Sequence, residues 1–404
     1  MTRPLAELDR DLAELGCVAL LVLAQGSRDP DLAPFVGAVH LGSAFLVAPV
    51  GAGPFLGFFT PMERGEAAAT GLALLSPEEL EVGKRVDEGR SPADLLAEVL
   101  SRGLGLAGVR PGRIALAGNG AAGVLWGACS RLAARGFELV PGNELTLLLR
   151  KTKTPAELAA ARAAAAGTCE AFRAIARRLA ASSVRDGELW SEGERLTVGR
   201  LRAGVAQTLA ARRLEPPQGN ILAPGRDAAV PHSTGDDDRV LRPREPLVVD
   251  LFPRGALFAD CTRTFCVGEP AEPLARAHAA VLDALAAAHR EALAGARGFT
   301  LQEAACARLG GAGYPTALSH PGTLAGYVHG LGHGVGHELH EYPSFRKQAG
   351  REGVLAPGDL FTLEPGLYDP EAGWGVRLED LVALGDGGPE SLTPLPYDLD
   401  PRAW

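Results

Sequence analysis

The sequence predicts a two-domain protein of class α+β, with a smaller α/β domain over residues 1–150 and a larger domain over residues 151–404. A chain of 404 residues has the length of two or three domains. In the first 150 residues, short apolar runs that suit strands alternate with segments of helical periodicity. Near residue 150 the composition changes to a basic segment followed by an alanine-rich helix, which marks the domain boundary.

The composition is that of an ordinary globular protein. Hydrophobic residues make up 46% of the chain and charged residues 22%, which excludes a disordered or fibrous protein. The 49 acidic residues outnumber the 40 basic ones, and the net charge is −9. A protein that binds nucleic acid or an anionic membrane generally presents a basic face. We therefore expect neither nucleic acid nor a membrane among the partners.

Cysteine spacing and the charges near the N-terminus indicate a cytoplasmic protein. The six cysteines form no Cys-x-x-Cys pair, and their irregular spacing fits neither a disulfide framework nor a zinc ribbon. Charged residues between Glu7 and Glu14 interrupt any apolar segment of a signal peptide. We expect reduced, mostly buried thiols.

One uncharged stretch, Leu41–Phe59, is long enough to cross a bilayer. Its glycines and prolines favour instead two short strands, near Ala44–Ala48 and Phe55–Phe59, joined by a Gly/Pro turn. We expect a hairpin here and not a transmembrane segment.

The other elements of the first domain alternate between helix and strand, which is typical of a layered α/β domain. Helical spacing of apolar residues predicts the helices, and short continuous apolar runs predict buried strands. The expected helices are Leu5–Leu15, Pro92–Leu100 and Ala121–Arg135, and the expected strands are Val18–Leu23, Ile114–Ala117 and Glu138–Val140.

The basic segment Leu149–Thr154 is predicted to be a solvated linker, with a nucleic-acid contact as the alternative. A helix follows, with Thr154 as its N-cap, Pro155 at the first helical position and Glu157 at the third. We expect this helix to run to about Ala181.

The second domain mixes helices and strands in two similar halves, and periodicity does not predict its topology. We expect helices near Glu188–Glu215 and Leu274–Leu293, with a strand-rich stretch between them at Leu247–Val267. Further strands are expected near Tyr327–His340, Leu360–Tyr368 and Gly375–Leu384.

Two carboxylates, Asp250 and Asp260, lie ten residues apart in the strand-rich stretch. Pro253–Gly255 supplies a turn between them, so antiparallel strands would bring both side chains to one place. The alternative for either residue alone is a role in a turn or a cap.

Four of the nine histidines fall within twelve residues, at positions 329, 333, 337 and 340. Histidine is a common metal ligand and titrates near neutral pH. The interleaved glycines disfavour a helix and allow close backbone approach. His337 and His340 are three residues apart, whereas the helical zinc motif H-E-x-x-H needs four. One such histidine could be structural, but four together favour a site.

Two further segments carry glutamates beside apolar strands. Glu364 ends an apolar run and precedes a Pro-Gly turn. Arg377 and Glu379 share one face of an alternating strand, with Leu378 on the opposite face. The alternative for either glutamate alone is a surface charge at a strand end.

Together these segments bring four carboxylates and a histidine from separate strands. Like charges raise one another's pKa and resist ionisation, so such a cluster needs compensation. Two divalent cations would balance the four carboxylates. Oxygen-rich ligands with one imidazole suit manganese, cobalt or zinc. A pair of such ions can lower the pKa of a shared water and stabilise an oxyanion.

The motifs resemble those of the Xaa-Pro peptidases, which comprise prolidase (Xaa-Pro dipeptidase) and Xaa-Pro aminopeptidase. The resemblance covers residues 150–404 strongly and the N-terminal domain through its overall layout. It implies the pita-bread fold that these enzymes share with methionine aminopeptidase and creatinase, preceded by a smaller creatinase-like α/β domain. The motifs are D-C-T-R-T-F from Asp260, H-G-L-G-H-G-V-G from His329, T-L-E-P-G-L-Y from Thr362 and V-R-L-E-D from Val376.

The resemblance implies a pair of divalent metal ions, with Mn²⁺ expected and Co²⁺ or Zn²⁺ as alternatives. In this family, the residues that match Asp260 and Glu379 bridge the two ions. The full set of implied ligands is Asp250, Asp260, His333, Glu364 and Glu379.

The resemblance also implies which residues act on the substrate. His232, His329 and His340 match histidines that position the substrate and assist the tetrahedral intermediate. Glu364 is expected to handle the proton of the attacking hydroxide, and Arg377 to orient a carboxylate. The implied substrate is a peptide or dipeptide with proline at its second position, and the implied assembly is a homodimer.

Two other functions stay open: hydrolysis of another small amide on the same scaffold, or a non-catalytic pita-bread binding module. A metal-free amidinohydrolase or a binding module is expected to lose ligands, whereas all five ligand positions are occupied here. The chain departs from the family twice. Asp250 and Asp260 are ten residues apart instead of eleven, and His337 replaces an apolar residue, so we expect His337 not to bind metal.

Overall fold

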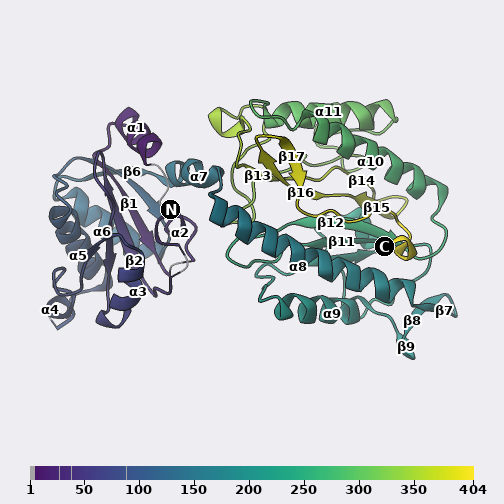
Figure 1. Cartoon of the computed structure of the whole chain (residues 1–404), viewed down its shortest axis with the longest axis horizontal. Helices are drawn as coiled ribbons and strands as arrows, with labels where there is room; N and C mark the ends of the chain where they lie inside the picture. The colour runs from purple at the N-terminus through teal and green to yellow at the C-terminus, as the bar shows by residue number, and fades with distance from the viewer. Residues whose placement is uncertain (1–4, 27, 38, 88) are drawn as a thin grey trace. The chain divides into compact units, whose positions relative to one another are not determined.

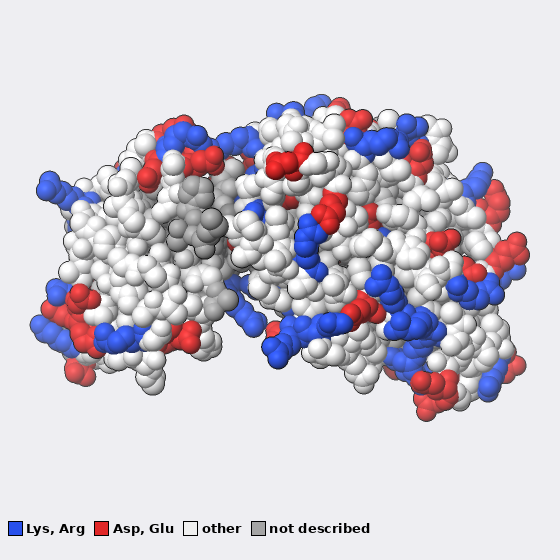
Figure 2. Space-filling model, in the orientation of Figure 1, with Lys and Arg blue, Asp and Glu red and all other residues white. Residues whose placement is uncertain are grey.

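The computed structural model describes residues 5–26, 28–37, 39–87 and 89–404. The chain folds into two compact units, Met1–Arg150 and Lys151–Trp404 (Figure 1). Each unit has its own sheets and its own hydrophobic cores. On the face that Figure 2 shows, basic and acidic side chains are interspersed over both units.

The first unit is built on one six-stranded sheet. Its strands are β1 (Ala19–Ala24), β2 (Ala44–Pro49), β3 (Phe55–Phe58), β4 (Ala73–Leu75), β5 (Arg113–Gly118) and β6 (Glu138–Pro141). Their order in the sheet is β4-β3-β2-β1-β5-β6. Strand β2 runs antiparallel to β1 and β3, whereas the pairs β1–β5, β3–β4 and β5–β6 are parallel.

Helices cover both faces of this sheet. They are α1 (Ala6–Glu14), α2 (Ala33–Val36), α3 (Arg64–Ala69), α4 (Val82–Asp87), α5 (Pro92–Leu106), α6 (Ala122–Ala133) and α7 (Asn143–Lys151). Because side chains alternate along a strand, Leu20 and Val22 of β1 share a core with α1, α2, α3 and α7. Leu21 and Leu23 share the opposite core with α4, α5 and α6. The predicted alternation of strands and helices is confirmed.

The uncharged stretch Leu41–Phe59 contains the antiparallel hairpin β2–β3, as predicted. Among the described residues, no helix is both long enough and apolar enough to cross a bilayer. The six cysteines are all free, and all of them except the half-buried Cys129 are buried. The prediction of mostly buried thiols is therefore confirmed.

The second unit is built from small antiparallel sheets. Its strands are β7 (Ser183–Arg185), β8 (Glu188–Ser191), β9 (Glu194–Arg195), β10 (Ile221–Pro224), β11 (Pro246–Leu251), β12 (Cys261–Cys266), β13 (Leu360–Leu363), β14 (Gly366–Asp369), β15 (Trp374–Arg377), β16 (Asp380–Gly385) and β17 (Gly388–Ser391). They pair in the orders β10-β11-β12, β13-β16-β17, β14-β15 and β7-β8-β9.

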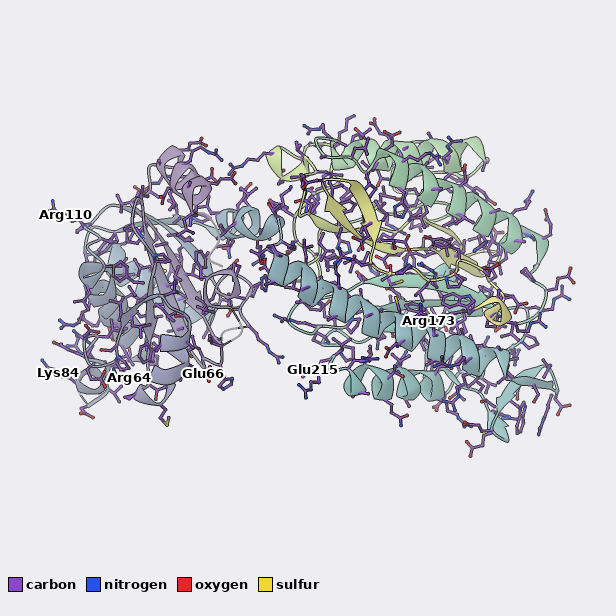
Figure 3. All side chains as sticks on the ribbon, viewed as in Figure 1. Arg64, Glu66, Lys84, Arg110, Arg173 and Glu215 are labelled. Atoms are coloured by element: carbon purple, nitrogen blue, oxygen red, sulfur yellow. The ribbon has the colours of Figure 1, made fainter. Side chains whose placement is uncertain are left out.

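Long helices cover these strands on both sides. Helices α8 (Pro155–Ala180) and α9 (Val198–Ala211) share one core with β10, β11 and β12. Helices α10 (Glu272–Glu291) and α11 (Gly298–Gly311) share another core with β13, β14 and β15. Figure 1 shows the strands between the two helix pairs, and Figure 3 shows the side chains that fill the space between helices and strands. Single 3-10 turns lie at Pro61–Glu63, Gly225–Ala229, Arg351–Gly353 and Pro401–Ala403.

Helix α8 begins with the predicted capping box. The backbone N–H of Glu157 donates to Thr154 Oγ1, and the backbone N–H of Thr154 donates to Glu157 Oε2 at 2.8 Å. Two of the N–H groups that a helix start leaves unpaired are thereby satisfied. The sequence therefore predicts this helix start correctly.

The basic segment before α8 is not the solvated linker that we predicted. Helix α7 extends to Lys151, whose Nζ lies 2.5 Å from Asp359 Oδ2. Lys153 Nζ lies 2.6 Å from Glu341 Oε1, and neither side chain of this second pair is exposed. A lysine can be buried when it is paired with an acid. Both acids lie about 200 residues further along the chain, so local composition does not reveal them.

Two predicted elements of the second domain are wrong. The expected helix over Glu188–Glu215 begins only at Val198, because its first part forms the β8–β9 hairpin with Gly193 at a positive φ of 82°. The expected strand over Tyr327–His340 is a loop that makes isolated bridges to its neighbours. Its interleaved glycines lower strand propensity. The sequence also did not predict α11.

Candidate metal centre

The predicted site residues meet in one cavity of about 460 Å³ within the second unit. The apolar part of its wall includes Ile221, Phe252 and Leu339. Every candidate named from the sequence lines it: His232, Asp250, Asp260, His329, His333, His340, Glu364, Arg377 and Glu379.

The β11–β12 hairpin positions the two aspartates. Asp250 lies in β11 and pairs with Thr262 of β12, and Asp260 directly precedes that strand. Both side chains reach the same cavity although their spacing is ten residues. The expectation that antiparallel strands bring these carboxylates together therefore agrees with the geometry.

A second strand pair positions the two glutamates. Leu363 of β13 pairs with Asp380 of β16, so Glu364 follows one strand and Glu379 precedes its antiparallel neighbour. Both glutamates therefore leave the pair at the same end. The backbone N–H of Glu379 also donates to the carbonyl oxygen of Thr262 at 3.0 Å. This bond brings the ends of the two strand pairs together.

The histidine-rich loop runs alongside β13, and its glycines permit this. The backbone N–H of Thr362 donates to the carbonyl oxygen of His333 at 2.9 Å, and that of Glu364 donates to Leu331 at 2.7 Å. A Cβ atom at Gly332 would clash with the carbonyl oxygen of Thr362. The close approach expected from the sequence is therefore present, and it aims His333 at the carboxylates.

The geometry of His333 fits a metal ligand. Its Nδ1 lies 3.0 Å from the carbonyl oxygen of Gly334, which can only accept, so Nδ1 carries the proton and Nε2 has a free lone pair. Nε2 lies 3.6 Å from Asp260 Oδ2 and 3.5 Å from Glu364 Oε1. Two atoms that ligate one ion at tetrahedral geometry lie about 3.4 Å apart. These separations therefore suit an ion between the three groups.

The carboxylates have the free oxygens that a metal requires. Ligand atoms of Asp260, His333 and Glu379 lie within 4.8 Å of one another. The buried atoms Asp250 Oδ1 and Asp260 Oδ1 accept no hydrogen bond from any described residue. A buried carboxylate oxygen without a donor is costly unless a cation binds it. The residues present therefore fit divalent metal ions.

The pKa values of the clustered carboxylates also indicate that the site lacks positive charge. Burial, followed by the charge of Glu379, raises the pKa of Asp260 well above its usual range. Burial and Glu364 do the same to the pKa of Glu379. Burial, with Asp250 adding to it, raises the pKa of Glu364 to about 8. Divalent cations would reverse these effects by supplying the missing positive charge.

Arg377 links the aspartate and glutamate sides of the site. Its Nη2 donates to Asp250 Oδ2 at 2.8 Å, and its Nε donates to Thr262 Oγ1 at 3.2 Å. Thr262 Oγ1 in turn donates to Glu379 Oε2 at 2.8 Å. Arg377 therefore holds Asp250 directly, whereas it reaches Glu379 through Thr262.

His329 lines the cavity, but the protein itself engages both of its ring nitrogens. Nδ1 lies 2.8 Å from the carbonyl oxygen of Gly330 and must donate to it. Nε2 therefore accepts, and its partner at 2.9 Å is the hydroxyl of Tyr368. That hydroxyl accepts from Arg377 Nη1 at 2.9 Å. Burial and Arg377 lower the pKa of His329 to about 4, so the ring is neutral.

His232 and His340 line the cavity and are both exposed. The ring of His340 lies edge-on to His333, with 4.2 Å between the ring centroids. Burial and the neighbouring His232 lower the pKa of His340. These two histidines therefore line the cavity while their side chains stay accessible to solvent.

The sequence analysis missed two residues of the site, Thr262 and Tyr368. Both lie inside motifs that it quoted, and both bind Arg377. The available signal was that each motif contains a residue with a hydroxyl group. His337, which was expected not to bind metal, does not line the cavity, and its Nε2 lies 2.9 Å from Glu157 Oε1.

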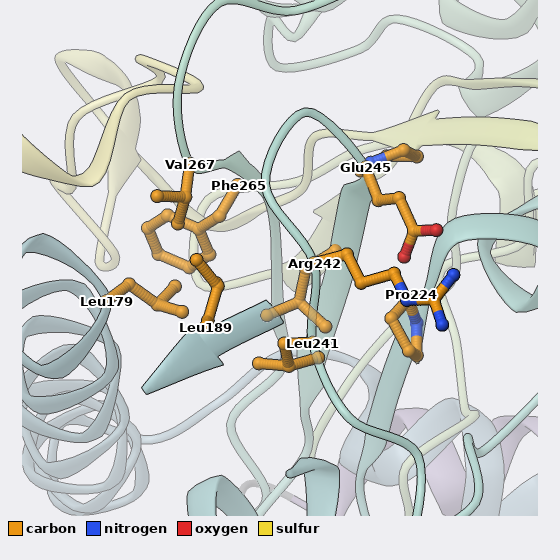
Figure 4. Close-up of a pocket in the computed structure, with 10 residues that line it drawn as sticks. Leu179, Leu189, Pro224, Leu241, Arg242, Glu245, Phe265 and Val267 are labelled. Carbon is orange, nitrogen blue, oxygen red and sulfur yellow. The ribbon is translucent and has the colours of Figure 1, made fainter. Parts of the chain in front are cut away.

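A second, much smaller cavity lies elsewhere in this unit (Figure 4). Its volume is about 10 Å³, and apolar side chains such as Leu179, Leu241 and Phe265 form most of its wall. It holds none of the predicted site residues.

Known proteins resemble this chain in sequence and in fold. Over 183 residues the chain is 36% identical to an Xaa-Pro dipeptidase of Pyrococcus furiosus, covering 44% of this chain and 48% of that protein. Over 283 residues it is 32% identical to Xaa-Pro aminopeptidase 2 of Streptomyces coelicolor, covering 63% of this chain and 57% of that protein. The chain thus spans about half the length of the curated relatives it matches.

A solved structure extends the likeness to the whole chain. The prolidase of Pyrococcus horikoshii superposes with a TM-score of 0.75 at 21% identity, covering 98% of this chain and 99% of that one. This likeness confirms the predicted fold, a C-terminal pita-bread domain preceded by a smaller α/β domain. The model of metallopeptidase family M24 matches residues 159–386, which is more than half of the chain. The chain therefore belongs to metallopeptidase family M24.

Proposed function

We propose that the chain is a metal-dependent exopeptidase that hydrolyses the bond between an N-terminal residue and a following proline. The observation that carries the proposal is the convergence of four carboxylates and four histidines on one cavity of about 460 Å³. The relatives named Xaa-Pro dipeptidase and Xaa-Pro aminopeptidase support the substrate class.

We propose that two divalent ions occupy the cluster, with Mn²⁺ favoured over Co²⁺ and Zn²⁺ because most ligands are oxygens. The ions would activate a water molecule and polarise the scissile carbonyl. In this proposal Asp260 and Glu379 would help to hold both ions. The residues that would hold the ions all line the cavity: Asp250, Asp260, His333, Glu364 and Glu379.

The chain's own residues have separate tasks in this proposal. Glu364, whose carboxylate faces the cavity beside His333, accepts the proton of the attacking water. His340 and His232, which line the cavity and are exposed, donate hydrogen bonds to the substrate and to its developing oxyanion. Arg377 orients Asp250 and, through Tyr368, holds His329 in place.

The domain division, the assembly and the location belong to the same proposal. We place the catalytic domain at residues 151–404 and the creatinase-like domain at residues 1–150, in a cytoplasmic homodimer. The free, mostly buried cysteines support a reducing compartment. The partner of the site is a peptide, and neither nucleic acid nor a membrane is part of the proposal.

The test is metal-dependent release of the first residue from proline-containing peptides. The chelated and dialysed protein is assayed with Mn²⁺ on an Xaa-Pro dipeptide, an Xaa-Pro-Xaa tripeptide and matched peptides with alanine at the second position. Release from the proline peptides alone supports the proposal, and the dipeptide-to-tripeptide ratio separates the two kinds of Xaa-Pro peptidase. Absence of release with Mn²⁺, Co²⁺ and Zn²⁺ would contradict it, as would an active Asp260→Ala variant.

A further inference from the structure

Asp380 directly follows the proposed metal ligand Glu379 in the chain. It forms a buried ion pair with Arg263, and the proposed reaction does not use this pair. Arg263 Nη2 lies 2.8 Å from Asp380 Oδ1, and neither side chain is exposed. Arg263 belongs to the motif that begins at Asp260, and Asp380 belongs to the motif that contains Glu379. The pair therefore connects the two segments that carry Asp260 and Glu379, and neither of its residues lines the cavity.

Arg263 uses all of its donors in this position. Nη1 donates to the carbonyl oxygens of Thr262 at 2.9 Å and of Glu379 at 2.5 Å. Nη2 donates to Asp380 and is shared with carbonyl oxygens of the C-terminal segment. Nε donates to the carbonyl oxygen of Pro396 at 3.0 Å. The planar guanidinium thus fixes several backbone positions at once.

The other carboxylate oxygen of Asp380 also has partners within hydrogen-bond distance. Oδ2 accepts a hydrogen bond from the hydroxyl of Tyr397 at 2.6 Å, and His289 Nε2 lies 2.9 Å away. The ring of Tyr397 also lies under the Arg263 guanidinium, 4.5 Å from its central carbon. The C-terminal segment 393–397, which lies beyond the stretch matched by the family model, therefore completes the arrangement.

The network holds Glu379 by its backbone, in addition to the Thr262 hydroxyl that holds its carboxylate. Arg263 binds the carbonyl oxygen of Glu379 itself, and the next residue, Asp380, is bound by Arg263 and Tyr397. A buried ion pair adds little net stability compared with apolar residues of the same volume. Its advantage here is geometric, because groups behind a metal ligand set the ligand's orientation.

We propose that Arg263, Asp380 and Tyr397 form a clamp that positions Glu379 for metal binding. Arg263 is the central positioning residue, and the clamp joins the C-terminal segment to the metal centre. This inference rests on the proposed metal-dependent function, because the ligand that the clamp positions is one of the five assigned there.

The test compares the same substitution, arginine to lysine, at two buried ion pairs. Arg263→Lys keeps the charge opposite Asp380 but loses the fork that binds the carbonyl groups. The control, Arg150→Lys, lies in the first unit, where Arg150 Nη1 is 2.9 Å from Asp31 Oδ1 with side chains 1% and 8% exposed. Mn²⁺ binding to the metal-free protein is measured by titration calorimetry, and the Tm of each metal-free protein by scanning calorimetry.

We expect both substitutions to lower the Tm, and Arg263→Lys alone to weaken Mn²⁺ binding, by about 10- to 100-fold. Tyr397→Phe, which keeps the ring and removes one donor to Asp380, is expected to weaken binding less, in the same direction. Unchanged Mn²⁺ affinity in Arg263→Lys would overturn the clamp. If that variant does not fold, unchanged affinity in Tyr397→Phe overturns it. Failure of the unsubstituted protein to bind Mn²⁺ would overturn the proposed function as well.

Discussion

Both units of the chain bury aspartates, and the comparison between them separates a structural acid from a functional one. In the first unit, Asp31 accepts from four donors. Oδ2 is bound by the backbone N–H of Gly118 and by Asn143, and Oδ1 is bound by Thr146 and Arg150. Its charge and its lone pairs are both satisfied within the protein, so the residue needs no ligand.

Asp260 in the second unit is also buried, but its surroundings do not satisfy its carboxylate as those of Asp31 do. Its Oδ1 accepts no hydrogen bond from the described residues, and its pKa is raised by burial and by Glu379, Asp250 and Glu364. Arg377 opposes this effect without cancelling it. The lesson is that burial alone does not identify a site. In Asp260, burial is combined with an unpaired oxygen and with three other carboxylates facing the same cavity, and this combination indicates a site.

The largest expected effect comes from neutralising the unsatisfied acid. Asp260→Asn should abolish Mn²⁺-dependent hydrolysis and weaken Mn²⁺ binding by more than about 100-fold, because it removes a ligand and not merely a group behind one. The same change should raise the Tm of the metal-free protein at neutral pH, since a buried, mutually repelling charge is lost. Calorimetry with and without Mn²⁺ measures both effects. A lower Tm of the metal-free variant would contradict the view that Asp260, unlike Asp31, is destabilising without a metal.

The satisfied acid should behave in the opposite way. Asp31→Ala removes the carboxylate that pairs with the buried Arg150, and we expect a loss of about 3–5 kcal/mol in the free energy of unfolding of the first unit. Denaturant titration measures this loss. Mn²⁺ affinity should stay at the level of the unsubstituted protein, and a reduced affinity would show that Asp31 has a role in the site.

Asp29 is an intermediate case that sharpens the comparison through pH. Its Oδ1 accepts from the backbone N–H of Asp31, and burial raises its pKa from 3.8 to about 6. The folded state therefore binds more protons than the unfolded state between these pH values. The stability of the first unit should fall as the pH rises from about 4 to 6, and Asp29→Asn should flatten this slope. Urea unfolding at several pH values tests it, and equal slopes would count against the assignment.

The smallest effect is expected at His337, which belongs to the histidine-rich loop but does not line the cavity. His337→Ala removes the contact with Glu157 Oε1 and should cost about 1 kcal/mol of stability. Hydrolysis and Mn²⁺ affinity should be unchanged, as measured in the same assays. A weakened metal affinity would assign this histidine to the centre.

Much of the site could be predicted from the sequence because its residues belong to short motifs at strand ends. Asp250, Glu364 and Glu379 follow or interrupt apolar runs, and this pattern indicates a polar side chain next to a buried strand. All nine candidates line the same cavity. The capping box at Thr154 and the β2–β3 hairpin were also predicted, since both depend on residues close together in the chain.

What local patterns could not predict depends on distant partners. The lysines of the basic segment are buried because Asp359 and Glu341 are brought to them by the fold. Tyr368 and Thr262 join the site through Arg377, although nothing in their sequence neighbourhood specifies that contact. The strand expected at Tyr327–His340 is a loop, because glycines lower its strand propensity and its hydrogen bonds run to β13.

The sequence by itself determined the two-domain layout, the motif residues and the excess of carboxylates that calls for cations. These properties follow from residue type and spacing, which act over a few residues. Only the tertiary structure decided which nitrogen of His333 is free, that Tyr368 and Gly330 engage both nitrogens of His329, and that Arg263 holds Glu379 from behind. These features require atoms from different strands to meet within about 3 Å, as a hydrogen bond demands, and packing alone sets such distances.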